Sequence, residues 1–187
     1  TSISVNVEVV HGIPGDCKLQ DGDIDSVDCG IPLGGYCGDS ALTIAIGKVS
    51  PAAERLCSVT QETLDLAIRE IRPGRRWSDI AAKMQEHVEK NGFACVREFV
   101  GHGIGTRMHE DPKVPNFVSD DFRKRGDFYL QPGMTLAVEP MVIQGGHEVV
   151  VLDDGWTVVT KDNTPAAHYE HTIAVTATGA DVLTDGR

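Results

Sequence analysis

The sequence predicts an α+β fold, in which a strongly twisted, mainly antiparallel sheet carries two helices on one side. Residues 2–10 alternate apolar and polar side chains, which is the period of a half-buried strand. Residues 50–90 place apolar side chains at helical spacing, and the last third of the chain is again rich in strand patterns. With 187 residues, 41% of them hydrophobic, the chain is large enough for one domain with its own core.

The first third of the chain is expected to consist of strands. HGIPGD, at residues 11–16, ends the first strand with a Pro-Gly turn. Residues 23–49 predict a hairpin, in which LGGY forms the turn because glycine tolerates its backbone angles. This hairpin would place Asp28 and Asp39 on neighbouring strands, with side chains that converge on one point.

Two helices are expected next. Ser50 and Pro51 predict the N-cap and first turn of a helix that ends at residues 72–74, Arg-Pro-Gly. Ser78 is the expected N-cap of the second helix, which ends at Asn91-Gly92.

The remainder of the chain is expected to return to strands and loops. Residues 93–100 predict a strand, followed by GHGIG and a proline-punctuated loop, and the charged residues 120–128 predict a solvated surface turn. Asp154-Gly155 is a hairpin turn signal. Further strands are expected within residues 135–143, 147–162 and 167–178.

The charge balance constrains the partners. The net charge of −11, from 17 basic and 28 acidic residues, argues against nucleic acid as the main ligand. Arg72, Arg75 and Arg76 form a short basic cluster, which is either a solvated helix end or a docking patch for ribosomal RNA or acidic partners. No run approaches the roughly 18 apolar residues of a membrane span and no secretory leader opens the chain, so we expect a soluble, cytoplasmic protein.

The cysteines indicate a reducing compartment. They are odd in number and form no CxxC pair, so free thiols are expected: Cys17, Cys29, Cys37, Cys57 and Cys95. Cys29 and Cys37 lie close to acidic residues. We expect them to pack rather than bind metal, because each neighbouring aspartate is the harder ligand.

Five side chains in separate local motifs are candidate metal ligands: Asp28, Asp39, His102, Glu139 and Glu170. Asp28 and Glu139 lie in apolar strands, where a buried carboxylate needs a compensating cation. Each alone is explained equally well by an ion pair. Four carboxylates and one imidazole together suit two hard divalent cations, such as manganese, iron, cobalt or zinc.

The same motifs resemble those of type I methionine aminopeptidases. They are HGIP at 11–14, GYCGDS at 35–40, GHGIGTRMHEDPKVPN at 101–116, PGMTLAVEPM at 132–141 and YEHTIAVT at 169–176. Successive candidate ligands are 11, 63, 37 and 31 positions apart, which also fits that family. The resemblance implies a pita-bread fold and removal of the N-terminal methionine from nascent polypeptides, by attack of metal-activated water on the first peptide bond.

The resemblance also implies roles for single residues. Asp28 would chelate one metal, Asp39 and Glu170 would bridge two metals, and His102 with Glu139 would complete the second site. Glu139 would also carry a proton to the leaving nitrogen, and His11 and His109 would contact the substrate. Trp156 and Met108 would line the methionine pocket, where Met108 replaces the usual aromatic residue.

Two aspects depart from the family pattern or leave alternatives open. Family members carry a further N-terminal segment, so we expect residues 1–187 to be a single catalytic domain with a truncated first half. A proline-specific relative (a prolidase or aminopeptidase P) shares similar ligands, and a non-catalytic binding scaffold is the alternative outside enzymes. N-terminal methionine peptides and nascent chains are the expected partners, with the ribosome as a candidate and no membrane or specific nucleic acid.

Overall fold

The structure, a computed structural model, describes residues 1–186, and every strand pair in that part of the chain is antiparallel. The largest sheet has eight strands in the order β1-β3-β6-β15-β10-β8-β9, with β16 beside β15. Its strands are β1 (Ser2–Val5), β3 (Ile24–Asp28), β6 (Ser40–Ala45), β8 (Gly101–Gly103), β9 (Glu110–Val114), β10 (Thr135–Val138), β15 (Glu170–Val175) and β16 (Ala180–Val182). The expected antiparallel α+β architecture is confirmed.

Three smaller sheets complete the strand layer. Their orders are β14-β11-β7, β12-β13-β2 and β4-β5. The strands are β2 (Glu8–Val10), β4 (Ile31–Leu33), β5 (Tyr36–Gly38), β7 (Ala94–Cys95), β11 (Met141–Ile143), β12 (Val149–Val151), β13 (Val158–Thr160) and β14 (Ala166–His168). The predicted turn at Asp154-Gly155 lies between the paired strands β12 and β13.

The predicted hairpin of residues 23–49 is confirmed, and its two strand pairs, β3–β6 and β4–β5, follow one another in the same register. Asp28 pairs with Ala41, the Cys29 N–H donates to the Ser40 carbonyl, and Ile31 pairs with Gly38. At the far end, the Cys37 N–H donates to the carbonyl of Gly105. The hairpin is therefore attached to the GHGIG segment, although more than sixty residues separate them.

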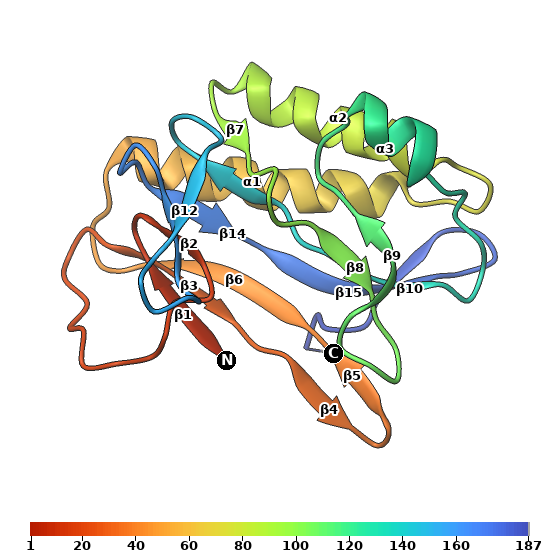
Figure 1. Ribbon diagram of the computed structural model, residues 1–187, viewed down its shortest axis with the longest axis horizontal. Coiled ribbons are helices and arrows are strands. Elements are labelled where there is room, and N and C mark those ends of the chain that lie inside the picture. Colours follow the sequence, from red (N-terminus) through yellow and green to blue (C-terminus); the bar gives the residue numbers. More distant parts are fainter. Residues whose placement is uncertain (187) are drawn as a thin grey trace.

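The two long helices lie side by side along one face of the sheets (Figure 1). As predicted, α1 (Pro51–Glu70) begins after Ser50, whose side chain accepts the Ala53 N–H. The second helix, α2 (Trp77–Lys90), begins earlier than predicted, and Ser78 is not its N-cap. Among the described residues, no helix is both long and apolar enough to span a bilayer.

The error at Ser78 has a clear physical cause. Its backbone N–H and hydroxyl both donate to the carboxylate of Asp127, 49 positions away. Arg76 occupies the N-cap position without a side-chain cap and instead forms an ion pair with Asp127. A distant carboxylate has therefore taken the role that sequence analysis gave to a local serine.

Four other expectations were wrong in detail. Residues 120–128 contain a short helix, α3 (Asp120–Arg125), because the Ser119 hydroxyl accepts the Phe122 N–H as an N-cap. Residues 93–100 contain only the two-residue strand β7. The proline-punctuated loop contains the strand β9, and the strand expected over residues 2–10 is bent at Asn6, where φ is 53°.

Trp77 anchors the core between the helices and the large sheet. It is fully buried among apolar side chains of α1, α2 and the sheet, and its indole N–H donates to the Pro115 carbonyl at 2.8 Å. Trp77→Ala should lower the free energy of unfolding by about 3–5 kcal/mol, as large-to-small core changes do. Urea denaturation tests this, with the 58% exposed Trp156 as a matched site where Trp→Ala should cost less than about 1 kcal/mol.

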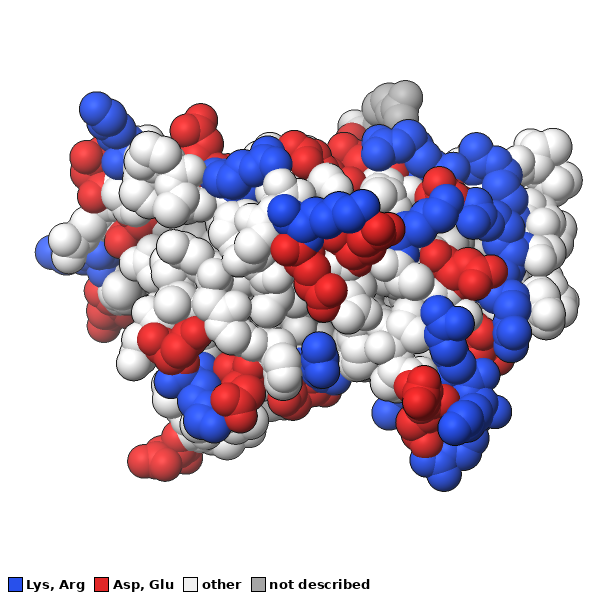
Figure 2. Space-filling model, turned by 90° about the horizontal axis from the view of Figure 1, so that it is seen from above, with Lys and Arg blue, Asp and Glu red and all other residues white. Residues whose placement is uncertain are grey.

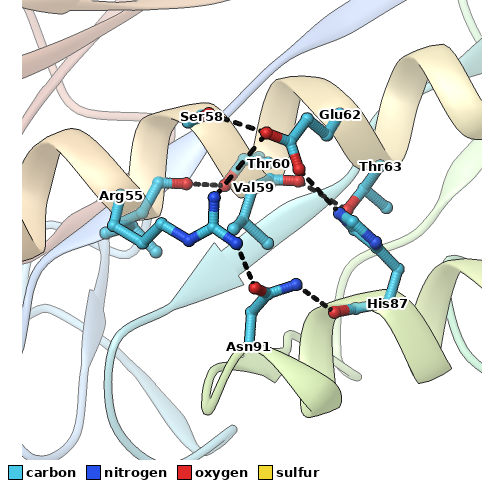
Figure 3. Close-up of polar contacts among 9 residues, drawn as sticks. Arg55, Ser58, Val59, Thr60, Glu62, Thr63, His87 and Asn91 are labelled. Atoms are coloured by element: carbon cyan, nitrogen blue, oxygen red, sulfur yellow. Dashed lines mark hydrogen bonds and ion pairs between the residues drawn. The ribbon is translucent and has the colours of Figure 1, made fainter.

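Figure 3 shows a polar network that joins α1 to α2. Glu62 accepts a hydrogen bond from Ser58 and lies 3.1 Å from the His87 Nε2. Arg55 reaches from α1 to the Asn91 side chain, whose amide donates to the His87 carbonyl. These groups are partly exposed, so the network aligns the two helices and adds little to stability.

Candidate metal centre and active site

A cavity of about 260 Å³ lies where the central strands of the large sheet meet. The structure brings all five predicted ligands and both predicted substrate histidines to its wall: Asp28, Asp39, His102, Glu139, Glu170, His11 and His109. These residues are spread over 160 positions of the sequence, from 11 to 170. The motifs that appear separate in the sequence therefore form one site.

The register of the sheet explains this convergence. Ala41 of β6 pairs with Asp28 of β3 on one side and with Glu170 of β15 on the other. His102 of β8 pairs with Ala137 of β10, two residues before Glu139. The ligands thus lie at one level, either in or directly beside the ends of five adjacent strands. Thr172 fixes Asp39 between them, because its hydroxyl accepts the Asp39 N–H and donates to the Asp39 carbonyl.

Three ligand atoms form a compact group. One atom each from Asp39, His102 and Glu170 lies within 4.8 Å of the other two. The His102 Nε2 is 3.9 Å from an Asp39 oxygen and 3.6 Å from a Glu139 oxygen. One oxygen of Asp39 and one of Glu170 are buried without a hydrogen-bond partner. Buried carboxylate oxygens without donors, beside an imidazole nitrogen, fit a divalent cation.

The tautomer of His102 also fits metal binding. Its Nδ1 lies 2.9 Å from the Gly103 carbonyl, and a carbonyl only accepts, so Nδ1 carries the proton. The Nε2 lone pair then points toward Asp39 and Glu139. A backbone carbonyl that orients a histidine in this way is usual at metal sites.

Burial and repulsion from neighbouring acids disfavour the ionised forms of Asp39, Glu139 and Glu170. Burial, with repulsion from Asp28, raises the pKa of Asp39 to about 6. Burial, with repulsion from neighbouring carboxylates, also raises the pKa values of Glu139 and Glu170. Burial lowers the pKa values of His11 and His102, so both rings favour the neutral form. Without a cation the folded protein holds a cluster of crowded acids, and a cation would relieve this repulsion.

The predicted substrate residues flank the ligands. The His109 ring lies 4.3 Å from the His102 ring between centroids. His11 stacks on Trp156 at 5.0 Å. A second cavity of about 330 Å³ shares Asp28, Asp39, His11 and His109 with the first and is also lined by Met108 and Trp156. Both predicted pocket residues therefore lie beside the ligands.

Sequence analysis missed six residues of the cavity wall, of which Phe99 and His168 contact predicted site residues through their rings. Phe99 packs edge-on against His11, with ring centroids 5.5 Å apart. His168 is 2% exposed, and its Nε2 lies 3.9 Å from a Glu139 oxygen. His168 is two positions before Glu170, and this spacing within a strand-rich segment was the signal that could have identified it. No comparable signal identifies Phe99.

Comparisons with known proteins agree with this geometry. Residues 1–177 match the profile of metallopeptidase family M24. The chain is 50% identical over 182 residues to methionine aminopeptidase 1 of Bacillus subtilis and 49% identical to the methionine aminopeptidase of Clostridium perfringens, with 97% of this chain and 72% of each relative covered. The crystal structure of the Thermotoga maritima methionine aminopeptidase matches with a TM-score of 0.93 and 46% identity, over 98% of this chain and 72% of that one. Prolidase from Pyrococcus furiosus, at 20% identity and a TM-score of 0.76, shares the fold, with 100% of this chain and 49% of that one covered.

Proposed function

The chain belongs to metallopeptidase family M24, and from this membership we infer that it is a metal-dependent methionine aminopeptidase. This hydrolase removes the N-terminal methionine from nascent polypeptides. The observation that carries the inference is the group formed by Asp39, His102 and Glu170, with its unpartnered carboxylate oxygens, in a chain about half identical to methionine aminopeptidases. The pita-bread fold implied by the resemblance is confirmed by the Thermotoga maritima structure.

We assign two divalent ions, cobalt, manganese, iron or zinc, to this site. Asp28 would bind the first ion, His102 and Glu139 the second, and Asp39 and Glu170 both. Four carboxylates balance two divalent charges, and the mixed oxygen and nitrogen donors suit these metals. When bound, such ions would lower the pKa of a water ligand to about 7 and polarise the substrate carbonyl.

The remaining steps fall to this chain's own side chains. Glu139 would take the proton released by the attacking water and deliver it to the leaving nitrogen, since a carboxylate beside the reacting atoms can accept a proton and pass it on. His109 would donate a hydrogen bond to the carbonyl oxygen as negative charge develops there. His11, held between Trp156 and Phe99, would contact the leaving amine side of the substrate.

The second cavity is the proposed methionine pocket. Met108 is flexible and polarizable, which suits contact with the thioether of a substrate methionine. Trp156 adds an aromatic wall through its stack on His11. We propose that residues 1–187 act together as one catalytic domain, because the ligands come from both its beginning and its end.

The test is hydrolysis of Met-Gly-Met by the metal-stripped chain, titrated with Mn²⁺, Fe²⁺ and Co²⁺. Activity that returns with metal is the expected result. An Xaa-Pro peptide serves as the contrasting substrate, and its preferential hydrolysis would indicate a prolidase-like enzyme instead. Metal binding by calorimetry without hydrolysis of either peptide would contradict the proposal, and the absence of both metal binding and hydrolysis would support a binding scaffold.

We also propose that the enzyme acts in the cytoplasm, beside the ribosome, where nascent chains emerge. Lys and Arg side chains gather at the end of the helical face where α1 ends and α2 begins (Figure 2). This basic end contains the exposed residues Arg72, Arg76, Arg123, Lys124 and Arg125. Arg76 and Arg125 are paired with Asp127 and Asp121, and the remaining positive charges make this end a locally basic surface for ribosomal RNA on a chain of net charge −11.

Ribosome binding through this basic end should depend on salt and on charge. The double variant Arg72→Glu/Lys124→Glu should bind ribosomes about tenfold more weakly in a sedimentation assay, because each contact to a phosphate is lost and replaced by repulsion. The matched variant Lys18→Glu/Lys48→Glu changes the same number of exposed charges elsewhere and should bind like the parent. Equal binding by both variants would exclude the basic end as the contact.

A further inference from the structure

His168 is a buried histidine at the active site to which the proposed reaction gives no role. It is the last residue of β14 and is 2% exposed. Its Nε2 faces the cavity wall without a hydrogen-bond partner. A polar nitrogen buried without a partner destabilises the fold, so its presence calls for a functional explanation.

The backbone of His168 is held firmly in place. Its N–H donates to the Thr43 hydroxyl at 2.9 Å, and the same hydroxyl donates to the His168 carbonyl at 2.9 Å. Because the Thr43 proton is thus used, Ser26 donates to the Thr43 oxygen at 2.8 Å. His168 also pairs with Met141 in the β11–β14 ladder. The imidazole therefore projects from a fixed point.

Glu139 lies between two imidazoles. One carboxylate oxygen is 3.6 Å from the His102 Nε2, and the other is 3.9 Å from the His168 Nε2. The second separation exceeds a hydrogen bond by about 1 Å. A small rotation of the Glu139 carboxylate closes it, and the Glu139 backbone is already held because the Asn116 amide donates to its carbonyl.

We propose that His168 is a positioning residue that donates an Nε2–H hydrogen bond to one oxygen of Glu139 and thereby turns the other oxygen toward the metal and His102. This inference rests on the proposed function for its catalytic consequence and on geometry alone for its effect on the carboxylate. A fixed carboxylate loses less freedom when it binds an ion, and it presents its free oxygen to the substrate in one orientation.

His168→Leu tests the proposal, because leucine keeps most of the volume and removes the donor. Calorimetric titration of the full chain with Mn²⁺ or Co²⁺ should show affinity for the ion assigned to His102 and Glu139 reduced by about 10–100-fold. The kcat for Met-Gly-Met should fall while KM changes little, because Glu139 acts on the reacting atoms rather than on substrate binding. His168→Gln supplies an amide donor and should recover most of both losses.

The control is His171→Gln. His171 lies next to Glu170 in β15, but its ring is hydrogen-bonded to Thr184. Metal affinity and kcat of His171→Gln should therefore stay near those of the parent. Melting temperatures measured alongside identify any variant that fails to fold. Wild-type affinity and kcat in His168→Leu, or equal damage in His168→Leu and His168→Gln, would overturn the positioning role. If the Co²⁺ absorption spectrum of His168→Gln differs from that of the parent, His168 is itself a metal ligand, and the positioning role is also overturned. If the parent chain hydrolyses no methionine peptide but His168→Leu still binds metal more weakly than the parent, the positioning role is supported. Only the proposed function is then contradicted.

Discussion

Replacing Glu170 with glutamine is expected to stabilise the metal-free protein while abolishing its activity. Glu170 is 2% exposed and has an unpartnered oxygen, and burial with repulsion from Glu139 and Asp39 raises its pKa well above the ordinary value. Glutamine keeps the shape, removes the charge and lets its amide donate to the neighbouring carboxylates. The free energy of unfolding at pH 7.5 should rise by about 2 kcal/mol, or roughly 4–8 °C in melting temperature.

The pH dependence of this gain follows from the direction of the pKa shifts. A carboxyl whose pKa is higher in the folded state binds protons more tightly there, so the metal-free protein loses stability as pH rises through the range between the unfolded and folded values. For Asp39 that range runs from 3.8 to about 6, which corresponds to about 2–3 kcal/mol. The stability difference between Glu170→Gln and the parent should therefore shrink toward zero near pH 4, where Glu170 is protonated in both folded and unfolded chains.

Activity should move in the opposite direction. Glu170 is assigned to both ions, so its loss should lower kcat/KM for Met-Gly-Met by about 10³-fold or more. This effect should exceed that of losing a residue, such as His168, that only positions a ligand. Thermal melts with and without Mn²⁺ measure both effects, since metal should stabilise the parent and not the variant. The exposed Glu86→Gln serves as control and should leave both the melting temperature and kcat/KM close to the parent values. A less stable metal-free Glu170→Gln would show that the crowded acids do not oppose folding.

The carboxylates that bind metal also destabilise the metal-free fold, and this is why they could be recognised in the sequence. Asp28 and Glu139 stood out because charges inside apolar strands conflict with folding alone. The hairpin pattern of residues 23–49 then predicted that Asp28 and Asp39 converge, and the structure has both in one cavity. Local rules sufficed there because the register of one hairpin is set within the segment itself.

Local rules failed where a distant residue decides the local structure. Ser78 looked like an N-cap, but Asp127 takes both of its donors. The sequence pattern did not distinguish His168 from other polar residues in strands. Its position beside Glu139 depends on the pairing of β14 with β11, which the local sequence does not predict. These contacts join segments that are 29 to 49 positions apart, and only the tertiary fold brings them together.

The second large effect is expected at His109. This side chain lies at the border of the two cavities, and its ring packs against the metal-facing ring of His102. A hydrogen bond that strengthens as charge develops on the carbonyl oxygen contributes to the transition state more than to substrate binding. His109→Ala should therefore lower kcat by about 10²–10³-fold and leave KM within a few-fold of the parent value.

Two further variants separate this role from loss of packing. His109→Asn keeps an N–H donor near the same place and should retain more kcat than His109→Ala, although both remove the ring. His87→Ala deletes a histidine of the network between α1 and α2, far from the cavity lining, and should keep the parent kcat. Steady-state kinetics with Met-Gly-Met at saturating Mn²⁺ supply all three values. If His109→Ala retains the parent kcat, the carbonyl oxygen does not depend on His109, and the polarisation must come from the metal site alone.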